Sequence, residues 1–281
     1  RSMENIKLVL RGPLPIKKIM RTIALIDADV VVYQQSLAVE SAIHWGDDLW
    51  TLHCDFREVQ QRVDIFLDDM QEVLNADGVI LALSCHSNSV FRRQVDSTYK
   101  ENRIGRRKPV VYGAIRDYLM KNYNAVLRNN LEADDILGIL STEPYTKDTF
   151  DEDLDEERII LSIDKDFFGV PGFVFNWNKE EEGVVEVTEH AAAWFHAFQT
   201  LTGDSADGYK GCPGVGPVTA KKLLSGKNPS EFWEIIAEEY DNAGLTEAYA
   251  LQQARLAYIL RHKNYNKETG QIKLWQPSSW K

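Results

Sequence analysis

Three short apolar runs, at residues 22–26, 79–83 and 159–163, place the strongest constraint on how this chain can fold. Their aliphatic composition is typical of strands that are buried on both faces. Residues 30–40 and 52–74 lie between the first two runs and carry apolar side chains at helical spacing. Strands that alternate with helices predict an α/β fold whose central, mainly parallel sheet is covered on both faces.

Acidic residues follow two of these runs directly. Asp27 ends the first run, and Asp164 and Asp166 follow the third. In open parallel sheets, ligands bind beyond the carboxyl ends of the strands. We therefore expect these carboxylates to face a common ligand at that edge.

Another acidic group opens an apolar helical segment. Glu132, Asp134 and Asp135 stand at its start, where anionic side chains also complement the helix dipole. Taken alone, this group is explained equally well by helix stability. A further pair, Asp204 and Asp207, repeats the pattern, and the recurrence favours a metal-dependent phosphodiesterase.

Phosphodiester hydrolysis explains why so many carboxylates would gather. Two divalent ions roughly 4 Å apart activate water and neutralise the attacking and leaving oxygens. Without metal, two unit charges about 4 Å apart repel by about 4 kcal/mol at an effective dielectric of about 20. Oxygen ligands suit magnesium or manganese, whereas zinc prefers His or Cys. The histidines are scattered without ligand spacing: His44, His53, His86, His190, His196 and His262.

Residues 90–108 form the most basic part of the chain. Phe91 and Tyr99 are interleaved with the basic side chains, which fits a surface that tracks phosphates and stacks bases. A solvated helix face is the simpler alternative, and the sequence leaves both open. The basic residues are Arg92, Arg93, Lys100, Arg103, Arg106, Arg107 and Lys108.

A turn at residues 211–216, reading Gly-Cys-Pro-Gly-Val-Gly, opens a predicted helix. Glycines let the backbone approach a phosphate closely, and a helix N-terminus offers free N–H donors. With the acid pair just upstream, this turn predicts contact with a nucleic-acid backbone. The residues expected to take part are Gly211, Gly214, Gly216, Thr219, Lys221 and Lys222.

The composition limits the classes of protein to which this chain can belong. The net charge of −11 does not exclude a nucleic-acid partner, because metal-ligating carboxylates inflate the acidic count. No apolar run approaches the roughly 20 residues of a membrane span. The three cysteines are far apart, which suits a reducing cytosol.

The remaining segments are expected to be structural. Residues 1–21 are predicted to form an arm, residues 148–157 a solvated acidic loop, and residues 173–177 with 183–187 a hairpin at a sheet edge. The last predicted helices lie at residues 191–200, 230–240 and 246–262.

The order of these motifs resembles the 5′-nuclease (flap endonuclease) superfamily. The matching segments are residues 26–27, 99–103, 132–135, 164–166, 203–207 and 211–216. Matches closer to the 5′→3′ exonucleases of podovirus-type phages extend the resemblance nearly to the C-terminus. They lie at residues 194–199, 257–261, 265–266 and 274–275.

The resemblance implies a PIN-like catalytic domain at residues 22–190, with a basic helical gateway at about residues 88–110. It also implies a helix–three-turn–helix DNA-binding region at residues 191–281, in which residues 211–219 bind duplex backbone with a potassium ion held by carbonyls.

The resemblance also implies two ligand groups for divalent ions. The first would be Asp27, Glu132, Asp134 and Asp135, and the second Asp164, Asp166, Asp204 and Asp207. Lys100 and Arg103 would contact the scissile phosphate.

One departure from the family pattern concerns metal binding. The family usually has an acid just after the second strand, where this chain has Ser84. Ser84 cannot contribute charge. Weaker binding of one metal ion, or a preference for a metal other than magnesium, is therefore an open alternative. His86 is a candidate to compensate.

The function implied is a divalent-metal-dependent 5′→3′ exodeoxyribonuclease that acts on 5′ ends of duplex DNA, with flaps and RNA–DNA hybrids left open as substrates. Two alternatives stay open: a weakened nuclease that only binds DNA ends, prompted by Ser84, and a PIN-type endoribonuclease, which usually lacks the glycine turn. A monomer acting in the host cytoplasm is expected.

Overall fold

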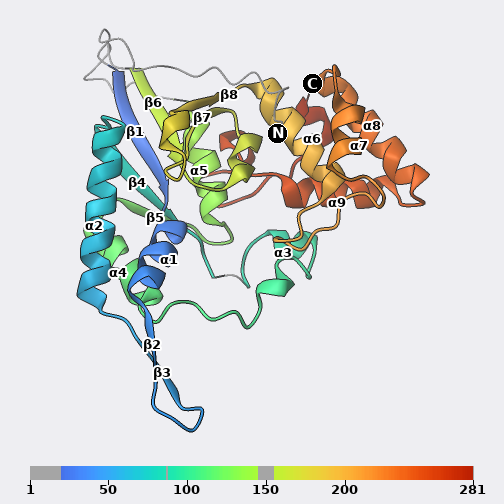
Figure 1. Cartoon of the computed structure of the whole chain (residues 1–281). Helices are drawn as coiled ribbons and strands as arrows, with labels where there is room; N and C mark the ends of the chain where they lie inside the picture. Colours follow the sequence, from blue (N-terminus) through green and yellow to red (C-terminus); the bar gives the residue numbers. More distant parts are fainter. Residues whose placement is uncertain (1–19, 87, 145–154, 281) are drawn as a thin grey trace.

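A six-stranded sheet, in the order β5-β4-β1-β6-β7-β8, forms the centre of the structure (Figure 1). The computed structural model describes residues 20–86, 88–144 and 155–280. All neighbouring strands are parallel except β7 and β8. The strands are β1 (Met20–Asp27), β4 (Gly78–Leu83), β5 (Ala125–Leu127), β6 (Asp155–Leu161), β7 (Gly172–Phe175) and β8 (Val185–Val187).

Helices cover both faces of this sheet. Those on one face are α1 (Ala28–Val39), α2 (Phe56–Val73) and α4 (Tyr112–Asn122). The other face is covered by α5 (Ala133–Ser141), and the helices beyond it are α6 (Glu189–Thr202), α7 (Pro217–Leu224), α8 (Pro229–Asn242) and α9 (Glu247–Ala257). The α/β fold with a mainly parallel sheet is therefore confirmed.

Strand β1 shows why the apolar runs predicted buried strands. Ala24 and Ile26 pack with the core under α1, α2 and α4, whereas Ile23 and Leu25 pack with the core under α5. Because successive side chains of a strand point to opposite faces, only an uninterrupted apolar run can fill both cores.

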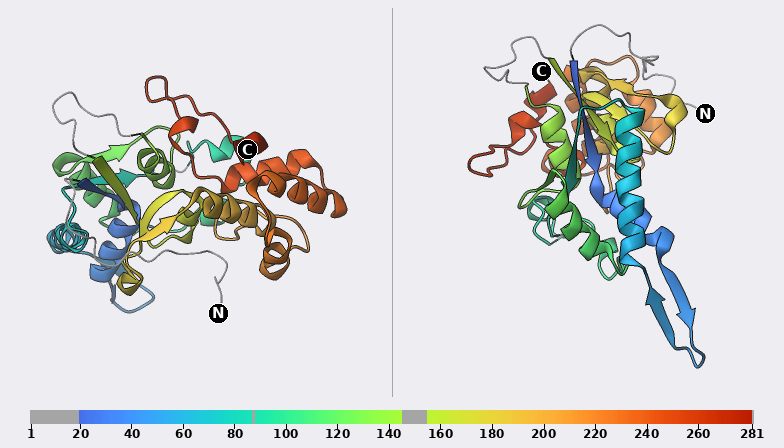
Figure 2. Two further views of the ribbon diagram at one scale, coloured as in Figure 1. Left: turned by 90° about the horizontal axis from the view of Figure 1, so that it is seen from above. Right: turned by 90° about the vertical axis from the view of Figure 1, so that its left-hand side faces the viewer.

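A hairpin between α1 and α2 was not predicted. Strands β2 (Ser41–His44) and β3 (Trp50–His53) pair with each other and extend away from the body of the molecule (Figure 1 and Figure 2). The prediction that residues 52–74 form one helix is wrong at its start. Helix α2 begins at Phe56, because the Asp55 carboxylate caps it by accepting from the N–H groups of the next turn.

The helical elements of the predicted gateway are α3 (Arg92–Val95) and a 3₁₀ turn, Glu101–Arg103. Two other predictions need correction. The helix predicted at residues 246–262 ends at Ala257, since the backbone is extended from Tyr258. Part of the acidic run, residues 155–157, belongs to β6, and residues 148–154 lie outside the described residues.

The predicted arm is likewise shortened from its C-terminal end. Met20 and Arg21 begin β1, and the rest of the arm lies outside the described residues. No helix in the described part of the chain is long and apolar enough to cross a membrane.

Candidate metal centre and nucleic-acid interface

Asp27 occupies the carboxyl end of β1, at the centre of the sheet. Its side chain caps α1 by accepting from the Val30 N–H at 3.4 Å, and it accepts from the Ser162 hydroxyl at 3.0 Å. Burial, together with the neighbouring carboxylate of Asp29, raises the pKa of Asp27 to about 7. A nearby cation would stabilise the ionised form of Asp27.

The start of α5 brings the second acidic group to the same edge. Glu132 and Asp135 form a reciprocal capping box. Helix stability therefore accounts for two of the three acidic residues at the start of α5. Asp134 serves no such cap. Burial and the carboxylates of Asp27 and Asp164 raise the pKa of Asp134 well above its usual range.

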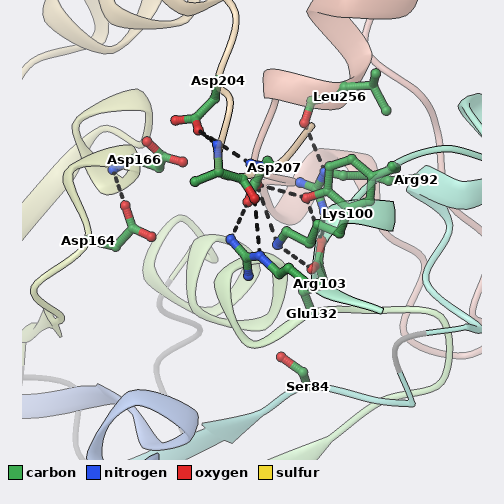
Figure 3. Close-up of polar contacts among 12 residues, drawn as sticks. Ser84, Arg92, Lys100, Arg103, Glu132, Asp164, Asp166, Asp204, Asp207 and Leu256 are labelled. Carbon is green, nitrogen blue, oxygen red and sulfur yellow. Dashed lines mark hydrogen bonds and ion pairs between the residues drawn. The ribbon is translucent and has the colours of Figure 1, made fainter. Parts of the chain in front are cut away.

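Glu132 is surrounded by donors. It accepts from Lys100 Nζ at 2.7 Å, from Arg92 Nη1 at 2.9 Å and from the Tyr99 hydroxyl at 3.1 Å (Figure 3). Burial acts to raise the pKa of Glu132, but Lys100 and Arg92 outweigh it and lower that pKa to about 2. Glu132 is therefore ionised over the whole physiological range.

The last two acidic groups come from separate loops. Asp164 caps a 3₁₀ turn, Lys165–Gly169, by accepting from the Asp166 N–H, and Asp166 accepts from Gln199 of α6 at 2.7 Å. Asp204 and Asp207 follow the end of α6, where Asp204 accepts from the Ala206 N–H. Burial and Asp164 raise the pKa of Asp166 to about 6.

Basic side chains balance the group formed by Asp166, Asp204 and Asp207. Lys165 Nζ lies 2.8 Å from both Asp166 and Asp204. Arg103 lies 2.6 Å and Lys100 3.4 Å from Asp207 (Figure 3). Among the described residues, no Lys or Arg forms an ion pair with Asp27, Asp134 or Asp164.

The predicted ligand groups are not yet arranged for coordination. Among the residues that the structure describes, no three or more His, Cys, Asp or Glu side chains converge as a metal site. The lysine and arginine contacts hold several carboxylates instead. The residues nevertheless fit a divalent cation, because burial and neighbouring carboxylates raise the pKa of Asp27 and Asp134, and neither side chain forms an ion pair with a Lys or Arg among the described residues.

Asp135 differs from the other predicted ligands. It is fully buried, and both of its oxygens accept from the Arg92 guanidinium, at 2.6 and 2.9 Å. Asp135 also accepts from the Leu260 N–H at 3.1 Å. The prediction that Asp135 is a metal ligand is therefore contradicted, because its lone pairs are already used within the core.

The prediction of direct DNA contacts by Arg92 and Tyr99 is wrong for the same reason. Their exposed fractions are 3% and 2%, so neither can reach a phosphate or a base. The exposed basic residues of this segment are Arg103, Arg106, Arg107 and Lys108. Glu40 anchors the segment by accepting from Arg107 and from the Val110 N–H.

The glycine turn divides into a buried and an exposed part. Gly211 is buried, and a Cβ at this position would meet the Gly203 backbone nitrogen at 2.3 Å, so it serves backbone packing and the predicted phosphate contact is wrong. Gly214 and Gly216 are exposed beside the N-terminus of α7. Thr219, Lys221 and Lys222 are exposed on α7 itself.

Ser84 has a structural partner at the edge of the site. Its hydroxyl accepts from the Ala133 N–H at 2.9 Å, which fixes the first turn of α5 next to Glu132 and Asp134. His86 is exposed in the following turn.

Sequence reasoning missed Asp29, which holds Ser84 in place. Its carboxylate accepts from the Ser84 N–H at 2.7 Å and from Tyr112, and it pairs with Arg116. Its spacing two residues after Asp27 was the available signal. Arg116 also donates to the Ser84 carbonyl.

The chain is similar in sequence to known phage exonucleases. No protein-family model matches the chain. It is 29% identical to the exodeoxyribonuclease of Enterobacteria phage T3, over 92% of this chain and 93% of that protein. It is also 29% identical to the exonuclease of Escherichia phage T7, over 91% and 93% of the two chains.

Solved structures show the same fold. A mutant of the T5 5′-exonuclease aligns with a TM-score of 0.55 at 12% identity, covering 84% of this chain and 87% of that one. A T5 5′-exonuclease with bound divalent zinc aligns with a TM-score of 0.55 at 13% identity, covering 84% and 89%. The chain is therefore similar over nearly its whole length to two phage exonucleases, and it shares the fold of the T5 5′-exonuclease.

Proposed function

We propose that the chain is a divalent-metal-dependent 5′→3′ exonuclease that removes nucleotides from the 5′ ends of duplex DNA and also cleaves flaps. The observation that carries this proposal is that carboxylates from four segments lie around the carboxyl edge of the sheet, where those of Asp27, Asp134 and Asp164 are close enough to interact electrostatically. Within that group, Asp27, Asp134 and Asp164 have no ion-pair partner among the described residues. The near full-length similarity to phage exonucleases supports the same activity.

The first ion would be held by Asp27, Asp134 and Glu132, and the second by Asp164, Asp166, Asp204 and Asp207. When bound, magnesium or manganese supplies activation of water and neutralises developing charge on the phosphate. Ser84 positions the start of α5 and lends no charge. Lys100, which lies between Glu132 and Asp207, would donate to the scissile phosphate.

The substrate would be recognised by its backbone rather than by its bases. Arg103, Arg106 and Lys108 would contact the strand that enters the site, and Arg93 would support the same segment. The exposed part of the turn, with Gly214, Gly216 and Thr219, would bind the duplex backbone together with Lys221 and Lys222, with a potassium ion at its carbonyls. RNA–DNA hybrids would be accepted on the same surface. The protein would act as a monomer in the host cytoplasm.

A DNA-end-binding protein without catalysis is the weaker alternative, because the loss of charge at Ser84 leaves seven predicted ligands in place: Asp27, Glu132, Asp134, Asp164, Asp166, Asp204 and Asp207. An endoribonuclease is also weaker, because the relatives with near full-length similarity are exonucleases.

The test is hydrolysis of a 5′-fluorescent blunt duplex, a 5′-flap and a single strand, with magnesium, manganese or EDTA. We expect metal-dependent release of short 5′ products from the duplex, and its loss in Asp134→Ala and Asp164→Ala. Asp117→Asn, an exposed acid on α4, is the matched control. Full activity in both site variants would refute the metal assignment, and binding without cleavage under every metal would favour the end-binding alternative.

A further inference from the structure

Lys165 is placed where a divalent ion would bind. Its ammonium group bridges Asp166, its neighbour in sequence, and Asp204, which follows α6, at 2.8 Å in each case. Its side chain is 61% exposed, so the contacts are not forced by burial. The Lys165 ammonium therefore neutralises the charge of carboxylates from two segments, as a bound metal ion would.

The two halves of the acidic edge differ in this respect. In the second proposed ligand group, Asp166, Asp204 and Asp207 contact Lys165, Arg103 or Lys100. In the first group Glu132 contacts Arg92 and Lys100, whereas Asp27 and Asp134 form no ion pair with a Lys or Arg among the described residues. An ion arriving near Asp27 and Asp134 has no ion pair of either side chain to break. An ion arriving near Asp204 must first displace an ammonium group.

We infer that Lys165 competes with the divalent ion for Asp166 and Asp204, so that the two ions bind with unequal affinity and Lys165 sets the weaker one. The inference rests on the proposed function, since it needs two ions at this edge. Lys165 acts here as a determinant of metal affinity and need not touch the substrate. In the absence of metal, the two ion pairs of Lys165 reduce the repulsion between Asp166 and Asp204.

The experiment is a calorimetric titration of the full chain with Mn²⁺ in the absence of DNA, with free Mn²⁺ followed in parallel by electron paramagnetic resonance. Lys165→Met removes the charge and keeps the length of the side chain, and Lys165→Arg keeps the charge. Lys179→Met is the matched control, because Lys179 pairs with Glu182 at 3.0 Å on the surface.

We expect two unequal sites in the native chain. Lys165→Met should tighten the weaker site by about threefold to tenfold, as expected for removing two partly exposed ion pairs, and leave the tighter site within about twofold. Lys165→Arg and Lys179→Met should resemble the native chain. Thermal unfolding of each variant checks that the fold is retained.

Other outcomes separate the two proposals. If the native chain binds two ions and Lys165→Met leaves the weaker site unchanged or weakens it, the competition is refuted while the metal centre stands. If no chain binds Mn²⁺, the metal centre itself is refuted, and the inference with it.

Discussion

Arg92 connects segments of the chain that are far apart in sequence. Its guanidinium pairs with Glu132, which caps α5, and donates to the Leu256 carbonyl (Figure 3). It also pairs with Asp135 of α5 and donates to the Tyr258 carbonyl. Every contact is buried. Arg92 therefore holds α3, α5 and the end of α9 together beside the acidic edge.

Removing Arg92 should cost far more stability than removing a DNA contact would. We expect Arg92→Met to lower the free energy of unfolding by about 3–5 kcal/mol, because Asp135 is left charged and buried without its partner. The measurement is chemical denaturation. Adding Asp135→Leu should recover part of the loss; if Arg92→Met alone is as stable as the native chain, the pair does not hold the core.

Lys100 has a different role, because its ammonium lies between two predicted metal ligands, 2.7 Å from Glu132 and 3.4 Å from Asp207. We expect Lys100→Ala to slow cleavage by about a hundredfold, since it removes a donor to developing negative charge. DNA affinity in EDTA should change less than about tenfold. Lys121→Ala on α4 is the control, and equal losses in rate and affinity would make Lys100 only a phosphate anchor.

At the scale of elements, helix α5 contacts the C-terminal segment through a glycine. A Cβ at Gly138 would meet the Leu260 carbonyl oxygen at 2.4 Å and the Ile259 side chain at 2.7 Å. The backbone of α5 can approach this closely only because Gly138 lacks a side chain.

Two glycine substitutions in helices should therefore have opposite effects. Gly138→Ala should destabilise the protein by about 2 kcal/mol, because overpacking outweighs the gain in helix propensity. Gly113→Ala, near the start of α4 with nothing within 4 Å of its added Cβ, should stabilise it by about 0.5 kcal/mol. Thermal unfolding of both variants would show this, and a stabilised Gly138→Ala would contradict the packing.

The elements also show what the sequence could and could not predict. Apolar runs such as residues 22–26 predicted strands correctly, because a strand buried on both faces needs apolar side chains at successive positions. Arg92 and Tyr99 were misassigned because the sequence shows only that basic and aromatic residues are close together. The same residue types occur on a DNA-binding surface and in a buried ion-pair network. Only the tertiary contact with Asp135 and Leu256 distinguishes them. Hairpin β2–β3 was missed because its residues are exposed on both faces, so no alternation marks it.

At the scale of the whole molecule, the two predicted regions share one core. The cluster under α5 joins Leu25 and Ile136 of the sheet region with Ala192, Tyr258 and Trp275. His196 of α6 lies in this shared core, where its Nε2 lies 2.7 Å from the Ala254 carbonyl and Trp275 stacks edge-on at 4.8 Å. Burial lowers the pKa of His196 to about 3.

His196 should make the fold sensitive to acid. The unfolded chain takes up a proton near the ordinary pKa of 6.5, whereas the folded chain resists protonation until about pH 3. His196 therefore contributes its full stabilisation above pH 6.5, and below that pH its own contribution to the free energy of unfolding falls by about 1.4 kcal/mol per pH unit. Denaturation at several pH values should show a smaller slope for His196→Gln, which keeps a donor for Ala254; an unchanged slope would exclude His196 as the cause.

Hairpin β2–β3 has a consequence for how freely the chain can vary. Trp45, Leu49 and Trp50 are 65%, 59% and 58% exposed, and no residue of either strand belongs to a buried cluster. A two-stranded hairpin without a core adds little to the free energy of unfolding. The folded state therefore places almost no restriction on these side chains, and the hairpin could be shortened or exchanged without loss of the fold around it.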